Sequence, residues 1–600
     1  MTDSDGPARG NNKIRSACDL CRHRKIRCDR AKPSCENCAL ARIPCTFTSR
    51  PAEARKSVRQ QLSETRSQVQ ALESLITRDP RSVPRPQEVP PSGSVPASRP
   101  NLHDTAHLDT ALWSFQQQLE NCWPGGARSP HKDTFCAVVS RHTGNHFTLD
   151  NAFEQISQSY RSQYVVTKKQ QASPEWPDPL LVKQCVEYYD FKNLYSVFPV
   201  VESRVVRELL NEGILDDPGK PTRAANRACL AAFTALIATI HRHKPAFARA
   251  EPDVYIRAAL ATLPDLFMEE PDVRTLEAFI LLVLYIHPTG QDHPADMLLA
   301  AAVRIVFQLG GHRSNPDESL RKHHSHYHLR ALFWLCYFMD KKSTIRTFQE
   351  PLINDSSCDL ELPPTYVPQS STHQFLQAPL TPQILLFPSD LRLALIQSKI
   401  YNLLYSDWAR AQPEARRLQH ILELDKELSA MESTFPAHCQ PHVFASKDSP
   451  VYAFHDLSMR GVSLHLDYYY CVKRVHEANN ATSAISSLSS GMELSYQTSR
   501  CILLYVNQVS SFITWHSFWI YSQPMLSAVL SIVYHCICNP VSPGFVEDLE
   551  MLERTMNIFT SLIGNSDDPT PFPPFYITEA FIHTMIRLAR QSYVKAAGMQ

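Results

Sequence analysis

The cysteine pattern C-x2-C-x6-C occurs twice between residues 18 and 45, first as "CDLCRHRKIRC" and then as "CENCALARIPC", with six residues between the copies. The N-terminus carries no apolar run typical of a secretory signal, so we expect the thiols to stay reduced and to bind metal. Zinc prefers four thiolates at the corners of a tetrahedron. Six cysteines satisfy two zinc ions only if two sulfurs are shared, because two tetrahedra have eight corners.

The two copies differ in charge. The segment "RHRKIR" (22–27) carries four Lys or Arg, whereas "ALARIP" (39–44) carries one. Residues 1–60 hold 14 Lys or Arg against 6 Asp or Glu, while the other 540 residues hold 46 against 54. Residues 1–60, the head, are thus cationic, whereas the rest of the chain, the body, is acidic. This difference indicates that the head alone binds a polyanion. We therefore expect the first copy to contact nucleic acid and the second to hold it in place; a purely scaffolding zinc site is the alternative.

Residues 18–45 resemble, without a gap, the fungal Zn2Cys6 binuclear-cluster transcription regulators, including the proline (Pro33) before the fourth cysteine. The resemblance implies a cofactor of two Zn²⁺ per chain. It also implies that Cys18 and Cys35 bridge the two metals. The remaining ligands are then Cys21 and Cys28 at one zinc, and Cys38 and Cys45 at the other.

The family pattern also implies which residues contact DNA. It places a basic pair at Arg24 and Lys25, and we expect Lys25 to contact the base edges of CGG-like half-sites, because Lys and Arg donate to guanine O6 and N7. We expect Arg22, Arg27 and Lys32 to contact phosphates and to make the affinity salt-dependent. The predicted partner is double-stranded DNA, and the basic segments favour localisation in the nucleus.

A heptad-like seam follows a polar linker at 46–57. Its positions recur at alternating steps of four and three over residues 58–76, with Thr65 inside it; the apolar members are Val58, Leu62, Val69, Leu72 and Ile76. The pattern favours a short coiled coil that forms a homodimer. A lone amphipathic helix that docks on the body is the alternative. Residues 79–103 are rich in proline, which predicts a disordered linker.

From about residue 178 the sequence has the texture of an all-α domain, with apolar stretches joined by short proline-marked links. Over 178–365 it resembles the fungal-specific transcription factor domain, notably in "FPVV" (198–201), "AVRIVFQLGGHR" (302–313), "LRALFWLCYFMDKKS" (329–343) and "PLINDSSCDLELP" (351–363). We expect residues 366–600 to form a helical extension. The predicted fold class is all-α: a small zinc cluster, a short coiled coil, a disordered Pro-rich linker and a large helical regulatory domain.

Four local expectations concern the body. Residues 104–121 are expected to form one helix with a stripe of Leu108, Leu112, Phe115 and Leu119, and residues 122–175 to form loops and short helices. Gly310 and Gly311 are expected to end a helix. The apolar stretch 510–537 is broken by Ser, His, Gln and Pro, which favours two buried helices over a membrane span.

The search for enzyme motifs finds no G-x-S-x-G elbow and no G-x-G-x-x-G loop. His324 and His328 are spaced for a metal on a helix, but such a run is more typical of a solvated helix start. We therefore predict a transcription factor for a metabolic gene set, with secondary metabolism among the candidates. A DNA-bound repressor or cofactor without its own activation function is one alternative, because "FVEDLEMLE" (545–553) fits a packed helix at least as well as an activation segment. An enzyme carried by the helical body is the other alternative. Transcription machinery and a small-molecule effector complete the expected partners, with no membrane.

Overall fold

The computed structural model forms two compact units, residues 1–98 and 99–600. In the first unit it describes residues 18, 21, 27–29, 31–41 and 45–46. In the second unit it describes residues 102–123, 129–163, 175–216, 221–242, 244–314, 326–363, 366, 384–435, 459–478, 488–514, 517–564 and 572–598. The predicted coiled coil at 58–76 lies outside the described residues. So does the predicted Pro-rich linker, except for residues 102 and 103, which belong to a helix.

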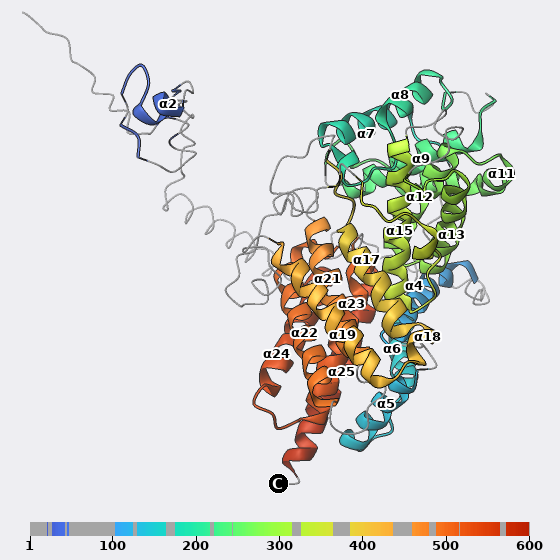
Figure 1. Cartoon of the computed structure of the whole chain (residues 1–600). Helices are drawn as coiled ribbons and strands as arrows, with labels where there is room; N and C mark the ends of the chain where they lie inside the picture. The colour runs from blue at the N-terminus through green and yellow to red at the C-terminus, as the bar shows by residue number, and fades with distance from the viewer. Residues whose placement is uncertain are drawn as a thin grey trace, which may run out of the picture. The chain divides into compact units, whose positions relative to one another are not determined.

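The described residues are mostly helical and contain no strand; the one isolated bridge pairs Tyr366 with Leu385. The first unit contributes the short helix α2 (Glu36–Ala41). The upper group of helices in Figure 1 comprises α7 (Pro179–Phe191), α8 (Ser203–Asn211), α9 (Ala224–Ile240), α10 (Pro252–Ala261), α11 (Leu263–Met268), α12 (Val273–Ile286), α13 (Asp292–Gln308) and α15 (His326–Thr347). The lower group comprises α4 (Leu102–Glu120), α5 (Pro130–Thr143), α6 (Leu149–Gln163), α17 (Leu391–Ile400), α18 (Asp407–Arg410), α19 (Glu414–Ser433), α21 (Met459–Glu477), α22 (Leu488–Gln508), α23 (Phe518–Cys538), α24 (Phe545–Gly564) and α25 (Pro573–Ala597).

Helices α9, α12 and α15 form the centre of the upper group. Their apolar side chains run round the helix instead of along one stripe, and Phe233, Phe279 and Trp334 are all buried. A helix that is apolar on every side must be covered on every side. Helix α12 accordingly packs between α9 and α13, while α10 covers α9.

The end of α13 confirms the predicted role of the glycine pair. Gly310 has a positive φ of 77°, which glycine adopts without the steric penalty of a Cβ. The Gly311 amide donates to the Val306 carbonyl at 2.9 Å, and the Gly310 amide donates to the Phe307 carbonyl at 3.1 Å. This pair of hydrogen bonds is a Schellman motif, which satisfies carbonyls that the helix end leaves free.

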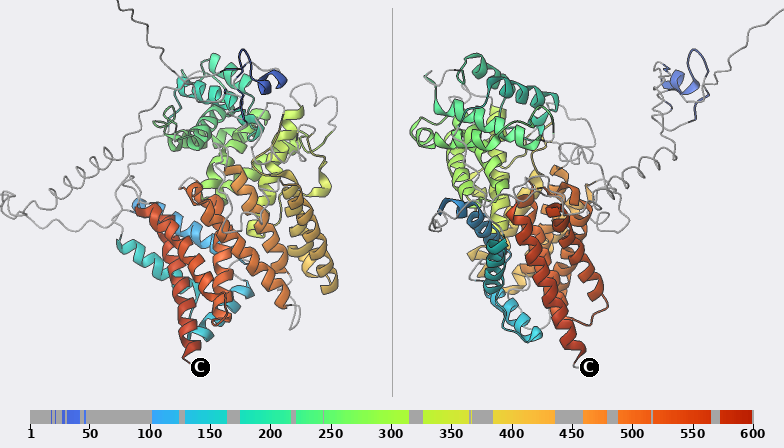
Figure 2. Two further views of the ribbon diagram at one scale, coloured as in Figure 1. Left: turned by 90° about the vertical axis from the view of Figure 1, so that its left-hand side faces the viewer. Right: turned by 180° about the vertical axis from the view of Figure 1, so that it is seen from behind.

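The lower group joins the beginning and the end of the second unit. Helices α4, α5 and α6 pack against α25, and α4 and α5 also pack against α23. Both views of Figure 2 show these blue-to-cyan helices beside the red ones. The predicted stripe on α4 is confirmed for Leu112, Phe115 and Leu119, which are all buried in this core. The side chain of Leu108 lies outside the described part of the chain.

Two regions differ from the sequence-based expectation. Residues 130–143 and 149–163, expected as loops and short helices, form the regular helices α5 and α6. Polar sequences such as that of α6 form helices here because the core formed by the distant C-terminal helices covers their few apolar residues.

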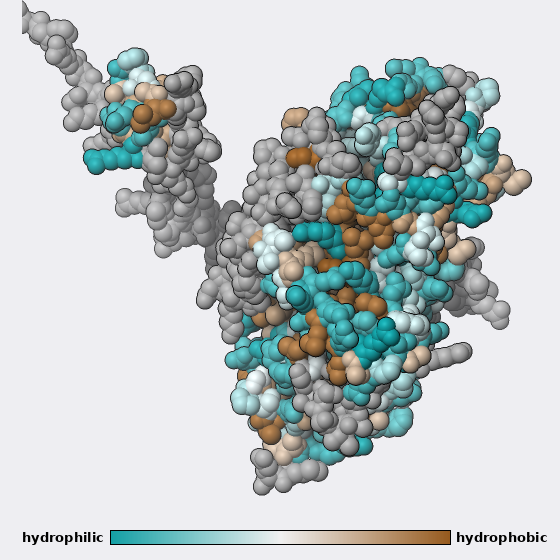
Figure 3. All heavy atoms as spheres, viewed as in Figure 1, coloured by the Kyte–Doolittle hydropathy of each residue, from teal (hydrophilic) through white to brown (hydrophobic). Residues whose placement is uncertain are grey.

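The stretch 510–537 does not form the two helices that were predicted. It forms a short 3-10 turn at Ser510–Phe512 and one helix, α23, which continues through Pro524. By length and composition α23 could cross a membrane, and it is the one such helix among the described residues. Yet 78 % of its most apolar window is buried inside the protein, as expected for a core helix. The face drawn in Figure 3 is mostly hydrophilic, with hydrophobic residues gathered near its middle.

Buried charges connect the two groups of helices. Lys342 on α15 lies 2.7 Å from Asp467 on α21, and both side chains are almost completely buried. Burial lowers the pKa of Lys342, and the neighbouring Asp467 carboxylate opposes this shift. Arg346, one turn further along α15, donates to the carbonyl of Ile520 on α23 at 2.6 Å. The upper and lower groups therefore share a polar contact in which buried cations find partners.

Candidate metal centre

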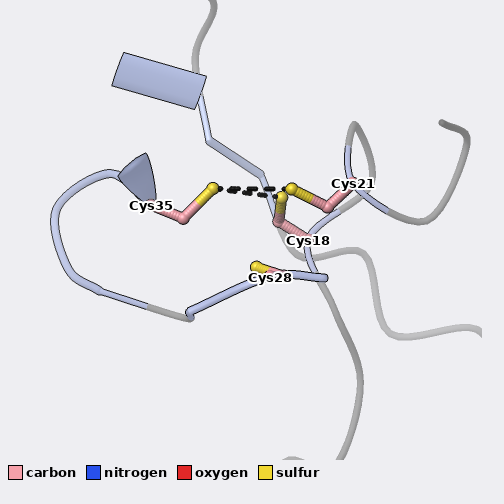
Figure 4. A group of neighbouring side chains, drawn as sticks. All are labelled: Cys18, Cys21, Cys28 and Cys35. Carbon is pink, nitrogen blue, oxygen red and sulfur yellow. Dashed lines mark hydrogen bonds between the residues drawn. The ribbon is translucent and has the colours of Figure 1, made fainter. Parts of the chain in front are cut away.

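The six N-terminal cysteines come together in two overlapping groups of four. The sulfurs of Cys18, Cys21, Cys28 and Cys35 all lie within 4.8 Å of one another. The same limit holds for the second group, which consists of Cys18, Cys35, Cys38 and Cys45. Figure 4 shows the side chains of the first group turned toward a common centre. Cys18 and Cys35 belong to both groups, one from each copy of the sequence repeat.

The sulfur–sulfur distances fit tetrahedral zinc. Cys18 Sγ lies 3.7 Å from Cys35 Sγ and 3.6 Å from Cys38 Sγ, and Cys21 Sγ lies 3.7 Å from Cys35 Sγ. Four sulfurs at about 2.3 Å from a zinc ion are separated by about 3.8 Å along each edge of the tetrahedron. Donor type and spacing therefore match two Zn²⁺ ions held by six thiolates.

Local structure around α2 positions the second copy of the repeat. The helix begins directly after Cys35 and carries Cys38 in its first turn, so one helical turn brings both sulfurs to the same side. Asp29, in the loop between the copies, accepts from the backbone amide of Glu36 at 3.2 Å. A carboxylate at this point satisfies a free amide at the start of the helix. The backbone amide of Cys35 also donates to Cys45 Sγ at 3.5 Å.

Burial and hydrogen bonds shift the pKa values of the metal-free thiols in opposite directions. The backbone amide of Cys21 lowers the pKa of Cys18 to about 6, against the opposing effect of burial. Burial raises the pKa of Cys21 to about 12, and it raises the pKa values of Cys35 and Cys38 as well. Zinc binds these cysteines as thiolates, so metal binding releases the protons that the thiols hold in its absence.

Only part of the predicted DNA-contacting set lies in the described residues. Arg27 and Lys32 are exposed, whereas Arg22, Arg24 and Lys25 lie outside the described residues. The side-chain amide of Asn37 on α2 donates to the carbonyl of Arg27 at 2.9 Å. This contact joins the second copy to the last residue of the basic segment, and sequence reasoning missed it. An asparagine between two ligand cysteines carries no signal by itself.

The histidine run in the body is not a metal site in the described residues, and His328 is not solvated as predicted. It is buried, with Nδ1 2.9 Å from the Tyr195 hydroxyl and Nε2 2.8 Å from Glu277 Oε1. His324 lies outside the described residues. A histidine with both nitrogens occupied serves the packing of α12 and α15, so the predicted solvated helix start is wrong for this residue.

The acidic segment 545–553 is part of a packed helix. It forms the first half of α24, with Phe545, Asp548 and Leu552 buried. The Asp548 carboxylate accepts from the Tyr496 hydroxyl at 2.7 Å and pairs with Arg500, which ties α24 to α22. Of the two interpretations left open by the sequence, the packed helix is the one seen in the structure.

Two family models match the chain. The fungal Zn(2)-Cys(6) binuclear cluster domain matches residues 16–54, which include all six cysteines. The fungal specific transcription factor domain matches residues 192–433 and overlaps the stretch on which the second resemblance was based.

Curated relatives are similar over much of the chain at low identity. An ABC-transporter-regulating transcription factor of Aspergillus fumigatus is 22 % identical over 93 % of this chain and 71 % of its own length. The Fusaridione A cluster transcription factor of Fusarium heterosporum is 25 % identical over 51 % of this chain and 58 % of its own length. The transcriptional activator protein acu-15 of Neurospora crassa is 24 % identical over 76 % of this chain and 51 % of its own length.

Proposed function

The chain is a fungal Zn2Cys6 transcription factor that binds two zinc ions, and on that premise we propose that it recognises CGG-like half-sites and regulates genes of RNA polymerase II. The family consists of transcription factors and not of enzymes, so no catalytic residue is assigned. The observation that carries the proposal is the pair of four-sulfur groups with two shared members. A transcription factor acts on double-stranded DNA in the nucleus.

The proposed zinc ligands follow from that sharing. Cys18 and Cys35 bridge the two ions, and each of the other four cysteines binds one ion. The first zinc takes Cys21 and Cys28; the second takes Cys38 and Cys45. The sulfur spacing near 3.7 Å supports this assignment. The cluster fixes both ends of the basic segment, which then needs no hydrophobic core of its own.

The proposed DNA contacts lie on the first copy of the repeat. Lys25, paired with Arg24, contacts base edges, while Arg22, Arg27 and Lys32 contact phosphates. The exposure of Arg27 and Lys32 supports their part in this assignment. A helix held in the major groove at one half-site, with the dimer setting the separation of two half-sites, is the geometry such modules use.

The proposed arrangement of the rest of the chain keeps the sequence-based boundaries, except that the Pro-rich linker ends at residue 101, because α4 begins at Leu102. Residues 46–57 form a linker, 58–76 a short dimerising coiled coil, and 79–101 a disordered linker, with the helical body behind them. Residues 178–365 would be the regulatory domain and 366–600 its helical extension. Residues 99–600 form one compact unit, in which α4–α6 share a core with α21–α25, so we place the helices before residue 178 in the helical body as well.

We propose a metabolic gene set as the target, with transport or secondary metabolism as its field. Two of the relatives, the ABC-transporter-regulating transcription factor and the Fusaridione A cluster transcription factor, support this choice. The acidic segment 545–553 gives no support to activation, because it is packed in α24. Fusing residues 101–600 to an unrelated DNA-binding domain distinguishes an activator from a repressor by the direction in which a reporter gene responds.

The test of DNA recognition compares two basic residues of the first copy. Lys25→Ala should lower the discrimination between CGG and altered triplets by about 1–3 kcal/mol, because it removes a base contact. Arg22→Ala should weaken specific and random DNA alike and flatten the salt dependence. Binding isotherms of the full chain at several salt concentrations measure both. Equal losses on specific and random DNA for Lys25→Ala would show that another residue contacts the bases.

A further inference from the structure

A cavity in the described part of the second unit is lined by residues of α24, of α25 and of the turn between α5 and α6. These four helices are labelled in Figure 1. The volume of the cavity is about 830 Å³, within the range of sites that hold small molecules. The corner turns at Gly144, whose φ is 80°, and contributes Thr143 and Asn145 to the wall. No residue of this cavity takes part in the zinc centre.

The wall of the cavity is cationic although the body as a whole is acidic. One face of α25 presents Arg587, Arg590 and Lys595 to the cavity, and Glu553 of α24 is the one carboxylate among the lining residues. Arg587 and Arg590 stand three residues apart on the same helix, a spacing at which like charges repel. Both side chains are exposed, so solvent screens this repulsion, and the two charges still make this face of α25 positive.

The pairing of the three cations leaves two of them without a counter-charge. Arg590 is paired with Glu553. Lys595 Nζ donates to the backbone carbonyl of Arg141 at 2.9 Å, a contact that does not neutralise its charge. Within the described residues, no carboxylate forms an ion pair with Arg587 or Lys595. The wall of the cavity therefore carries a net positive charge, with the exposed Arg587 as its cation without an ion-pair partner among the described residues.

Apolar groups and amides complete the surface. Met556 of α24 and the exposed Val594 of α25 supply apolar contact, while Ile586, which is almost completely buried, forms the floor between them. Asn557 and Gln591 offer neutral donors beside the cations. A ligand that uses all of these groups must carry a negative charge on an apolar body, because inorganic anions would leave the apolar part unused.

We propose that this cavity binds a small organic anion, a carboxylate on an apolar body, with Arg587 as the main anchor. A bound ligand would touch Thr143 and Asn145 as well as α25, and would thereby clamp the α5–α6 corner to the C-terminal helices. That corner belongs to the first part of the body that follows the DNA-binding head in sequence. Describing the ligand as an effector rests on the proposed function; its binding does not.

The test uses octanoate as the probe on the full-length protein, with octanamide as its uncharged analogue and inorganic phosphate as a charge-only control. Calorimetric titration should show octanoate binding at least ten-fold tighter than either control. Arg587→Gln should weaken octanoate binding at least ten-fold. Arg554→Gln makes the same charge change on α24 outside the lining residues, and it should leave the affinity within two-fold of the parent.

Three results would overturn the proposal: no octanoate binding to the parent, equal binding of phosphate and octanoate, or an unchanged affinity in Arg587→Gln. Tighter binding of an oligoglutamate peptide than of octanoate would also overturn it, in favour of an acidic protein segment. Binding to CGG-containing DNA is measured on the same samples. If the parent shows no specific DNA binding, the proposed function is contradicted, but the octanoate result is still valid. The two failures are therefore distinguishable.

Discussion

Arg346 on α15 donates a hydrogen bond to the carbonyl of Ile520 on α23, the carbonyl that Pro524 leaves without its helical partner. In an uninterrupted helix the amide of residue 524 would donate to residue 520, and proline has no amide hydrogen. The guanidinium takes the place of that donor at 2.6 Å. One buried cation thus allows α23 to continue through a proline and joins the two groups of helices.

This relationship predicts a coupling between residues 346 and 524. Arg346→Met should lower the free energy of unfolding by about 1–3 kcal/mol, because it leaves the partly buried Ile520 carbonyl without its donor. In a Pro524→Ala background the new amide can reach that carbonyl, so the same substitution should cost about 1 kcal/mol less. Urea denaturation of the full chain, followed by tryptophan fluorescence, measures all four proteins of the cycle.

The cycle has an internal control at an exposed cation. Lys399 is paired with Glu427 on the surface, where ion pairs contribute little. Lys399→Met should change stability by less than about 1 kcal/mol in either background. Additive effects of Arg346→Met and Pro524→Ala would show that the hydrogen bond does not compensate for the proline.

Asn37 predicts a contribution of the second cysteine copy to DNA binding. Its amide holds the Arg27 carbonyl, so Asn37→Ala should loosen the end of the basic segment and weaken DNA binding about five-fold, or about 1 kcal/mol. Zinc content should stay at two ions per chain. Glu36→Ala is the matched control, since only the backbone amide of Glu36 makes the bond to Asp29. A parent-like affinity in Asn37→Ala would mean that the cluster alone positions the segment.

The shared sulfurs predict unequal effects of cysteine substitutions. Full-length protein should contain two zinc ions, and Cys18→Ser or Cys35→Ser should lose both, because each serves both metals. Cys28→Ser or Cys45→Ser should retain one. Zinc should dissociate as the pH falls, since protons compete for the thiolates. Metal analysis after gel filtration measures these ratios; one zinc per six cysteines in the folded parent would contradict the shared-sulfur assignment.

The heptad seam predicts how the protein occupies its DNA sites. Replacing Leu62, Val69 and Leu72 with Asp should abolish the preference for paired half-sites, because two clusters are then no longer held at a high effective concentration. Zinc content and binding to single half-sites should not change. Gel-shift titrations with single and paired sites separate these effects. If the triple variant still prefers paired sites, the seam docks on the body and the dimer forms elsewhere or not at all.

Sequence reasoning succeeded where the signal itself is local. The cysteine spacing within each copy of the repeat, the helical spacing of the stripe on α4 and the glycine pair after α13 are all short-range patterns. It failed where distant residues decide. Pro524 is typical of a helix break, but Arg346, 178 positions earlier, supplies the missing donor, and the helix continues. The polar histidine run is typical of a solvated helix start, but Tyr195 and Glu277 bind both ring nitrogens of His328 in the interior. The Asn37 contact depends on the metal fold and has no signature of its own.

The shared core of α4–α6 and α25 has a consequence for synthesis on the ribosome. Helix α6 ends at Gln163 and α25 begins at Pro573, so the first helices of the body leave the ribosome about 400 residues before their last partner. At a synthesis rate of about 5–20 residues per second, the apolar faces of α4–α6 that pack on α25 stay uncovered for roughly 20–80 seconds. The zinc cluster contains all its ligands in the first 45 residues and can form within that interval. A nascent chain would thus carry a folded DNA-binding head before its body is folded. Chaperones are expected to bind the uncovered apolar faces during this interval.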